Sequence, residues 1–220
     1  MKRILALAVS VLMAAAPAAL ADGKAVVDGA KCGDCHKMAG PAAKTIAEVL
    51  QRKAPDLFYA GSKFKKEWLV KYIQNPTTLR PGGTVYINNV TTEGEQDMVK
   101  NPPKCAAKLS AGDAAAAADY LMTLTDASMK AGVFKEGKIK KAKARVVMQK
   151  EEACNACHIL GGSGGISCPT LDGANERLNP DWVYSFIQNP QHWDPKVWMA
   201  KRDFDDATLQ LMVNYLMQAD

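Results

Sequence analysis

Two short segments with the same order of chemical groups constrain this 220-residue chain more than any other feature. Each segment has two cysteines separated by two residues, and a histidine directly follows the second cysteine. The segments are Cys32-Gly33-Asp34-Cys35-His36 and Cys154-Asn155-Ala156-Cys157-His158. On about one turn of helix, two thiols and an imidazole with this spacing lie close together. Each segment therefore predicts one binding site.

The spacing CxxCH is the attachment signature of haem c. The two thiols can add to the two vinyl groups on one edge of a porphyrin, and the next residue can hold the iron as its proximal nitrogen ligand. We therefore predict two covalently attached haems, each with one iron. The predicted attachment residues are Cys32, Cys35, Cys154 and Cys157. The predicted proximal iron ligands are His36 and His158.

Three other uses of paired cysteines explain the two segments less well. A structural zinc site has no need of a histidine directly after the second cysteine in both copies. A thioredoxin-like redox pair needs only one copy, within alternating strands and helices. Ordinary extracellular disulfides leave both adjacent histidines unexplained.

The chain also repeats itself beyond the two cysteine segments. Residues 67–76 (EWLVKYIQNP) return as residues 181–190 (DWVYSFIQNP), 114 positions later. Residues 119–122 (DYLM) return as residues 214–217 (NYLM), 95 positions later, whereas the two CxxCH segments are 122 apart. The chain is therefore two copies of one unit, and the second copy is shorter both before and after its middle segment.

Each half resembles a class I cytochrome c domain, and the tandem resembles dihaem cytochromes of the c4 kind. The resemblance covers essentially all of the chain after its first 21 residues. It implies an all-α fold in which a first helix leads into CxxCH, a middle helix covers the haem and a last helix crosses the first. The expected domains are residues 22–130 and 131–220, joined near residues 126–138.

Local signals agree with that plan. Residues 23–31 and 142–152 can each form the helix that leads into a CxxCH segment. Asn179-Pro180 and Asn189-Pro190 are start and stop signals for the second middle helix. Ser62 is the expected cap of the first middle helix, which Asn75-Pro76 ends. Ser110 with Asp113 and the acidic residues Asp203, Asp205 and Asp206 mark the starts of the last helices. No stretch shows convincing strand alternation.

The resemblance implies a methionine as sixth ligand of each iron, on the loop between the middle and last helices. In the second half this loop carries Met199, just before the final helix. In the first half the position 114 residues earlier is Val85, and the methionine of the longer loop is Met98. Ligation by His192 is not expected, because that residue follows the middle helix at the haem edge, so we expect a surface histidine there.

The resemblance also implies a proline carbonyl that accepts a hydrogen bond from the ring N–H of each haem histidine, on the nitrogen that does not bind iron, which fixes the ring. Pro41 and Pro169 are the prolines to which this role is assigned in the two halves.

Two cysteines remain outside the CxxCH segments, Cys105 in the first half and Cys168 in the second. In an oxidising compartment, a disulfide between them is the first expectation. Two separate free thiols are the second. A third possibility is that Cys105 binds the first iron as a thiolate, in place of Met98, which would lower the potential of that haem.

The first 21 residues predict an export signal. Lys2 and Arg3 precede an apolar stretch over residues 4–12, and an alanine-rich run ends before Asp22. The apolar core is too short to span a bilayer unless the segment is retained, so an uncleaved anchor is the alternative to cleavage. We expect a protein of the periplasm without a membrane span after cleavage.

The charge of the chain argues against nucleic acid as a partner and suggests an acidic redox protein. The whole chain has a net charge of +5, and the part after residue 21 is only mildly basic, which does not indicate nucleic-acid binding. Residues 135–150 contain seven basic side chains and one acidic side chain, which forms either a solvated helix face or a docking patch for an acidic redox protein.

The sequence thus predicts an exported dihaem cytochrome c that passes single electrons between a donor and an acceptor redox protein. It could also be a subunit of a larger redox complex. The alternative function is a dihaem enzyme, or the haem subunit of one, that acts on a small sulfur compound or a small oxidant.

Overall fold

The structure of the protein is a computed structural model that describes residues 22–218, so the predicted export signal lies outside the described residues. The first half contains α1 (Gly23–Gly29), α2 (Ile46–Leu50), α3 (Ala60–Lys63), α4 (Lys66–Gln74) and α5 (Ala111–Thr123). The second half contains α6 (Lys141–Val146), α7 (Ala174–Arg177), α8 (Pro180–Gln188), α9 (Pro190–Trp193) and α10 (Asp206–Met217). A π-helical turn, Val147–Glu151, extends α6. Short 3-10 turns cover Cys32–Asp34, Tyr86–Asn88 and Cys154–Ala156.

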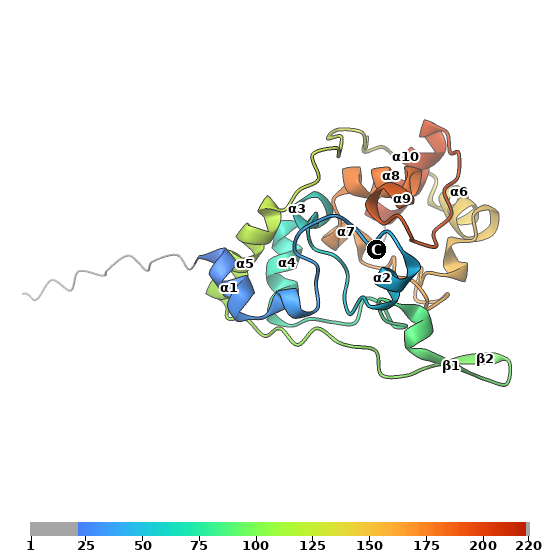
Figure 1. Ribbon diagram of the computed structural model, residues 1–220. Helices are drawn as coiled ribbons and strands as arrows, with labels where there is room; N and C mark the ends of the chain where they lie inside the picture. Colours follow the sequence, from blue (N-terminus) through green and yellow to red (C-terminus); the bar gives the residue numbers. More distant parts are fainter. Residues whose placement is uncertain (1–21, 219–220) are drawn as a thin grey trace, which may run out of the picture.

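Each half forms its own helical core, as the all-α prediction requires. In the first half, α5 packs against α1, α3 and α4 (Figure 1). In the second half, α10 packs against α6, α7 and α8. The first core is built from Val27, Ala60, Leu69, Ala117, Ala118 and Leu121. The largest buried side chains of the second core include Met148, Trp182, Ile187, Trp193, Leu209 and Met212. In each domain the last helix packs on the first, as expected.

Most of the predicted helix signals are confirmed. The Asn179 side chain accepts a hydrogen bond from Asp181 N (3.0 Å) at the start of α8, where Pro180 is the first helical residue. Ser110 and Asp205 cap α5 and α10 in the same way. The predicted cap of the first middle helix was wrong: α4 begins after Lys65, and Ser62 lies buried in α3, where its hydroxyl accepts a hydrogen bond from Asp126 N (2.9 Å).

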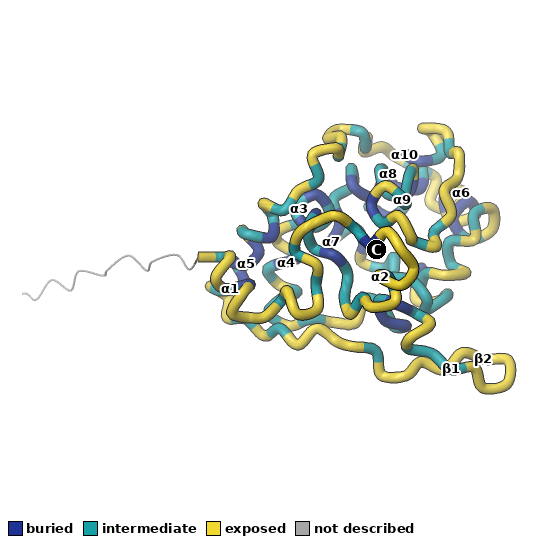
Figure 2. Tube along the Cα trace, viewed as in Figure 1, coloured by how far each residue is buried: buried dark blue, intermediate teal, exposed yellow. Residues whose placement is uncertain are grey.

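The expectation that no stretch forms a strand was also wrong. β1 (Val90–Glu93) and β2 (Gln96–Val99) form an antiparallel hairpin that projects from the body of the molecule (Figure 1). Gly94, with φ of 64°, begins the two-residue turn. Every residue of β2 is exposed, so the hairpin has no buried face to impose alternating hydrophobicity on the sequence (Figure 2).

Close packing between α1 and α5 depends on Gly23. A Cβ atom at this position would lie 2.0 Å from the Ala116 carbonyl oxygen. We expect Gly23→Ala to lower the free energy of unfolding by about 1–3 kcal/mol, because one of the two helices must move. Gly29, at the other end of α1, has no atom within 4 Å of such a Cβ, so Gly29→Ala is the matched control and should lose no stability. Urea unfolding of both variants checks this, and equal midpoints would contradict the packing explanation.

The two halves meet through equivalent segments. Lys65 N donates to Arg177 O (2.9 Å), and Asn179 N donates to Lys63 O (2.8 Å). Phe64 and Leu178, between them, form an antiparallel bridge. Each partner in this contact lies 114 positions from its equivalent in the other half, which is the spacing of the sequence repeat. The halves are therefore joined by a nearly symmetric contact, in which residues 63–65 of the first half pair with the equivalent residues 177–179 of the second.

Side chains close the rest of this interface. Tyr59 packs edge-on against Trp193 (ring centroids 5.4 Å apart), and the Lys63 ammonium lies over the Trp182 ring at 4.8 Å. The Arg52 guanidinium pairs with the Asp194 carboxylate at 2.5 Å, and both side chains are largely buried. Because these contacts join α3 and the loop after α2 to α8 and α9, the halves form one packed unit.

The segment between α5 and α6 packs on the second half. Gly132 N and Phe134 N both donate to the Asp181 carboxylate (2.8 Å each), and Gly137 N donates to the Asn214 side chain (2.9 Å). The domain boundary at residues 130 and 131 stays a prediction. None of the helices described in residues 22–218 is long and apolar enough to cross a membrane.

Candidate functional site

The two CxxCH segments have the same backbone conformation. In each, a residue in the left-handed region precedes the first cysteine: Lys31 has φ of 55° and Ala153 has φ of 50°. A 3-10 turn follows, and the histidine N–H donates to the carbonyl of the first cysteine, at 2.9 Å for His36 and 3.0 Å for His158. The two cysteines and the histidine of each segment therefore lie on one hydrogen-bonded turn of backbone.

The histidine of each CxxCH segment is held by a proline carbonyl. His158 Nδ1 lies 2.6 Å from the Pro169 carbonyl oxygen, as predicted. His36 Nδ1 lies 2.7 Å from the Pro55 carbonyl oxygen, so the assignment of this role to Pro41 was wrong. The repeat contains the missed signal, because Pro55 lies 114 positions before Pro169, whereas Pro41 was chosen for its closeness to the motif.

These hydrogen bonds decide which ring nitrogen is free. A ring that donates through Nδ1 leaves the lone pair of Nε2 available for a metal. Burial lowers the pKa of both His36 and His158, although each proline carbonyl acts in the opposite direction. A neutral ring is the form that binds iron, so burial and orientation both prepare these histidines to act as ligands.

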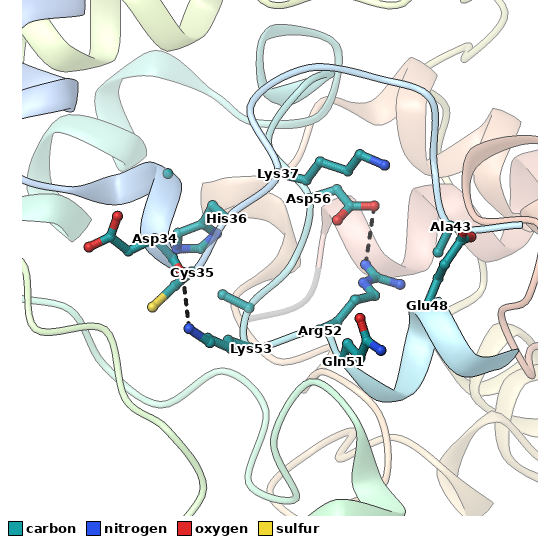
Figure 3. A pocket seen from close by; sticks show the side chains of 12 residues that line it. Asp34, Cys35, His36, Lys37, Ala43, Glu48, Gln51, Arg52, Lys53 and Asp56 are labelled. Atoms are coloured by element: carbon teal, nitrogen blue, oxygen red, sulfur yellow. Dashed lines mark hydrogen bonds and ion pairs between the residues drawn. The ribbon is translucent and has the colours of Figure 1, made fainter. Parts of the chain in front are cut away.

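A cavity of about 390 Å³ lies beside the first CxxCH segment (Figure 3). It is lined on one side by Cys35 and His36 and on the other by Ala43 and Arg52. The Lys53 ammonium donates to the Asp34 carbonyl at 3.3 Å and so ties the lower edge of the cavity to the attachment turn. Its wall therefore contains the Cys35 thiol, the His36 imidazole and the Arg52 guanidinium.

Three cations act on the two CxxCH histidines. Lys63 lowers the pKa of His36, whereas Arg80 and Arg177 lower the pKa of His158, in each case after burial. Burial and the two arginines lower the pKa of Lys63 itself to about 7. Burial is likewise the main cause that lowers the pKa of Arg80 and Arg177. A group of like charges that is partly withdrawn from solvent, such as this one, favours an anionic ligand.

Two buried donors beside this group have no hydrogen-bond acceptor among the described residues. They are Arg52 Nε and Trp182 Nε1. A buried donor without an acceptor costs free energy, so its presence indicates a group that supplies one. The propionates of haem are carboxylates, which are acceptors and anions at once. The thiols, the free Nε2 atoms, these donors and the cations therefore all fit haem, whose propionates the cations and donors would hold.

Met199, the predicted sixth ligand of the second iron, lies on the loop between α9 and α10. It is half-buried and packs against the second core, in the same cluster as Trp182 and Phe186. The Gln191 side-chain amide donates to the Met199 carbonyl (2.7 Å) and so holds the loop against α9. The backbone at Met199 is thus fixed by a hydrogen bond, whereas ligation of iron by its side chain stays a prediction.

Met98 lies elsewhere in its own domain. It is in β2, opposite Thr91 in β1, with 47% of its surface exposed. The predicted ligand loop of the first half thus carries its methionine on the projecting hairpin. The ligation of the first iron by Met98 stays a prediction.

The expected disulfide between Cys105 and Cys168 is not formed, and both are free thiols. The two cysteines lie beside different CxxCH segments. Cys168 N donates to Cys157 O (3.0 Å), whereas the charge of Cys105 acts on Cys32. The spacing in the sequence could not show this, because the two loops belong to different domains.

His192 is a surface histidine, as expected. Its ring is 42% exposed, and Nε2 lies 2.8 Å from the Ser128 hydroxyl in the segment between the domains. The seven basic side chains of residues 135–150 are also exposed.

Comparison with known families agrees with this arrangement. The family model for cytochrome c matches residues 20–125, and the model for subunit III of cbb3-type cytochrome c oxidase matches residues 140–216. The two matches are consecutive and each contains one CxxCH segment. No curated protein and no solved structure matches the chain.

Proposed function

Because the chain consists of two tandem c-type cytochrome domains, we propose that it is an exported dihaem protein that carries single electrons between two larger redox proteins. The observation that supports this most directly is the pair of equivalent histidines, each fixed by a proline carbonyl, on the two sides of one buried interface. Two equivalent sites in one packed unit suit a carrier that receives an electron at one domain and releases it at the other.

When bound, each haem supplies an iron that alternates between the ferrous and ferric states. The residues of the chain bind the iron, orient the ligands and exclude water. His36 and His158 bind the irons through Nε2, with Pro55 and Pro169 preventing ring rotation. Aromatic side chains on the middle helices exclude water: Trp68 stacks on Tyr72 (4.6 Å between centroids), and Trp182 packs on Phe186 (4.8 Å).

The cations of the interface balance charge. Lys63, Arg80 and Arg177 would neutralise haem propionates that would otherwise be buried without a partner. Since these residues come from both halves, the charge balance of each haem depends on the other domain. We infer that the two sites are coupled through this interface.

Two surface features support docking of redox proteins. Trp198, next to the predicted ligand Met199, is 71% exposed, and large exposed aromatic residues are typical of contact sites. The basic segment 135–150 suits an acidic partner and would raise the rate of encounter at low salt. Export to the periplasm is part of the proposal and is supported by the character of residues 1–21.

The test uses the haem-loaded protein. A carrier accepts two electrons per chain, returns them to a one-electron oxidant, and shows no turnover with thiosulfate, sulfite or hydrogen peroxide. Sustained turnover of any of these compounds would contradict the carrier function and support the alternative, a dihaem enzyme. Both outcomes are read by absorbance at the haem bands, with rapid mixing for the electron transfer and steady-state assays for turnover.

A further inference from the structure

The loop before α5 is anchored to the first domain directly before its last helix, and the loop with Met199 packs on the second domain directly before α10. Leu109, directly before the cap of α5, donates its N–H to the Ile73 carbonyl (3.3 Å) and packs against the first core. Phe204, directly before the cap of α10, packs against the second core. Both loops therefore reach their last helix at equivalent places, and positions can be counted back from there.

Counted back from the last helices, the position equivalent to Met199 in the first half is not Val85, which the offset of 114 positions between the middle helices indicates. Met199 lies five positions before Phe204, and Cys105 lies four positions before Leu109. Met98 lies eleven positions before Leu109. Similar residues follow the two sulfur atoms, Ala-Lys-Arg after Met199 and Ala-Ala-Lys after Cys105. In the first half, the position of the ligand methionine is thus occupied by a cysteine, within one residue.

The surroundings of Cys105 agree with this alignment. Cys105 lies close enough to Cys32 and to Tyr72 for its charge to act on both residues. Burial raises the pKa of Tyr72 to about 12, with Cys105 acting in the same direction. Tyr72 is the α4 residue equivalent to Phe186, which lies in the cluster that contains Met199. Cys105 therefore lies near both the attachment turn and the aromatic wall of its domain.

Met98 has none of these neighbours among the contacts of the described residues. Its strand is exposed along its whole length and pairs only with β1, at a distance from the helices of the first domain (Figures 1 and 2). The loop that contains Cys105, by contrast, runs from the hairpin back along the first domain to α5 (Figure 1).

We propose that the sulfur of Cys105 is the sixth ligand of the iron in the first domain. This inference rests on the proposed function, because it requires a haem at Cys32 and Cys35. The thiol loses its proton to solvent, and a lone pair of the resulting thiolate forms the iron–sulfur bond, with no electron gained or lost. Cys105 is exposed, as are the attachment cysteines Cys35 and Cys157, so exposure does not separate it from the residues that would hold the haem.

Such a ligand would set the direction of electron transfer between the two haems. A thiolate pushes electron density onto iron and stabilises the ferric state, whereas a methionine favours the ferrous state. With Cys105 on one iron and Met199 on the other, the first haem is the harder to reduce. An electron that enters at the first domain then moves downhill to the second.

The test compares three variants of the haem-loaded full chain: Cys105→Ala, Met98→Ala and Cys168→Ala. Electron paramagnetic resonance of the ferric protein should show a thiolate-type low-spin signal that Cys105→Ala abolishes and the other two variants keep. Cys168 is the matched control, because it is the other free cysteine outside the attachment segments. An unchanged signal in Cys105→Ala would overturn the proposal, and so would loss of a methionine band of the first haem in Met98→Ala.

A second variant keeps the test informative if Cys105→Ala folds poorly. Cys105→Met should bring the two steps of a redox titration closer together and add a second methionine–iron absorption band. Titration steps and bands identical to those of the unaltered protein would overturn the proposal. The mass of the intact protein gives the number of haems in each sample. Two haems without a thiolate signal would refute only the proposal that Cys105 is a ligand. A chain without haem would refute the proposed function.

Discussion

Replacing Met199 with alanine is expected to abolish the methionine–iron absorption band of the second haem and to open its sixth coordination position. The iron should then bind added carbon monoxide or imidazole, which the unaltered protein excludes. The potential of the second haem should also fall by an appreciable part of the roughly 0.8 V range over which axial ligands set haem potentials. Absorbance in both oxidation states and a redox titration measure the three effects.

The control for this variant is Met129→Ala. Met129 lies between α5 and α6 and packs against the same second core as Met199, but it has no role as a ligand. It should lose a little stability through reduced packing and keep the methionine band. An intact band in Met199→Ala would show that another group binds the second iron.

Replacing Asp194 with alanine is expected to destabilise the joint between the domains. The variant leaves the Arg52 guanidinium largely buried, with only Asp56 nearby at 3.5 Å. Removing one partner of a buried ion pair costs about 3 kcal/mol or more, because the remaining charge is uncompensated. Urea unfolding of the haem-loaded protein should show this loss, with the two halves unfolding at separate midpoints.

Two further variants separate charge from packing. Asp28 pairs with Lys24 on the exposed surface of α1, so Asp28→Ala should leave stability unchanged. The double variant R52M/D194L removes both charges of the pair but leaves the buried Asp56 carboxylate without its cation, so it should recover only part of the loss. If Asp28→Ala is as destabilising as Asp194→Ala, or if the double variant recovers nothing, the buried pair is not what holds the joint.

The local features of both sites could be predicted from the sequence because they depend on neighbouring residues. The CxxCH turn, the cap at Asn179 and the caps at Ser110 and Asp205 are each formed within a few positions of one another. The repeat of 114 positions even contained the partner of His36, since it relates Pro55 to Pro169. That partner was missed because closeness in sequence was preferred to equivalence between the halves.

The features that could not be predicted depend on contacts between distant segments. Ser62 resembles a helix cap, but tertiary structure buries it, and its hydroxyl serves the backbone of Asp126 instead. Phe64 and Leu178 form a bridge between the halves, and each lies just before a middle helix. Neither segment has a sequence pattern that predicts strand pairing. Nothing in either half alone shows that the two would pair, because each contact exists only when both domains are folded.

The most direct test of the account is the mass of the intact protein after maturation in a host that attaches haem c. The chain should carry the mass of two haems, and digestion should recover them on peptides containing Cys32 with Cys35 and Cys154 with Cys157. A bare polypeptide, or haem that is removed by denaturation alone, would contradict the account.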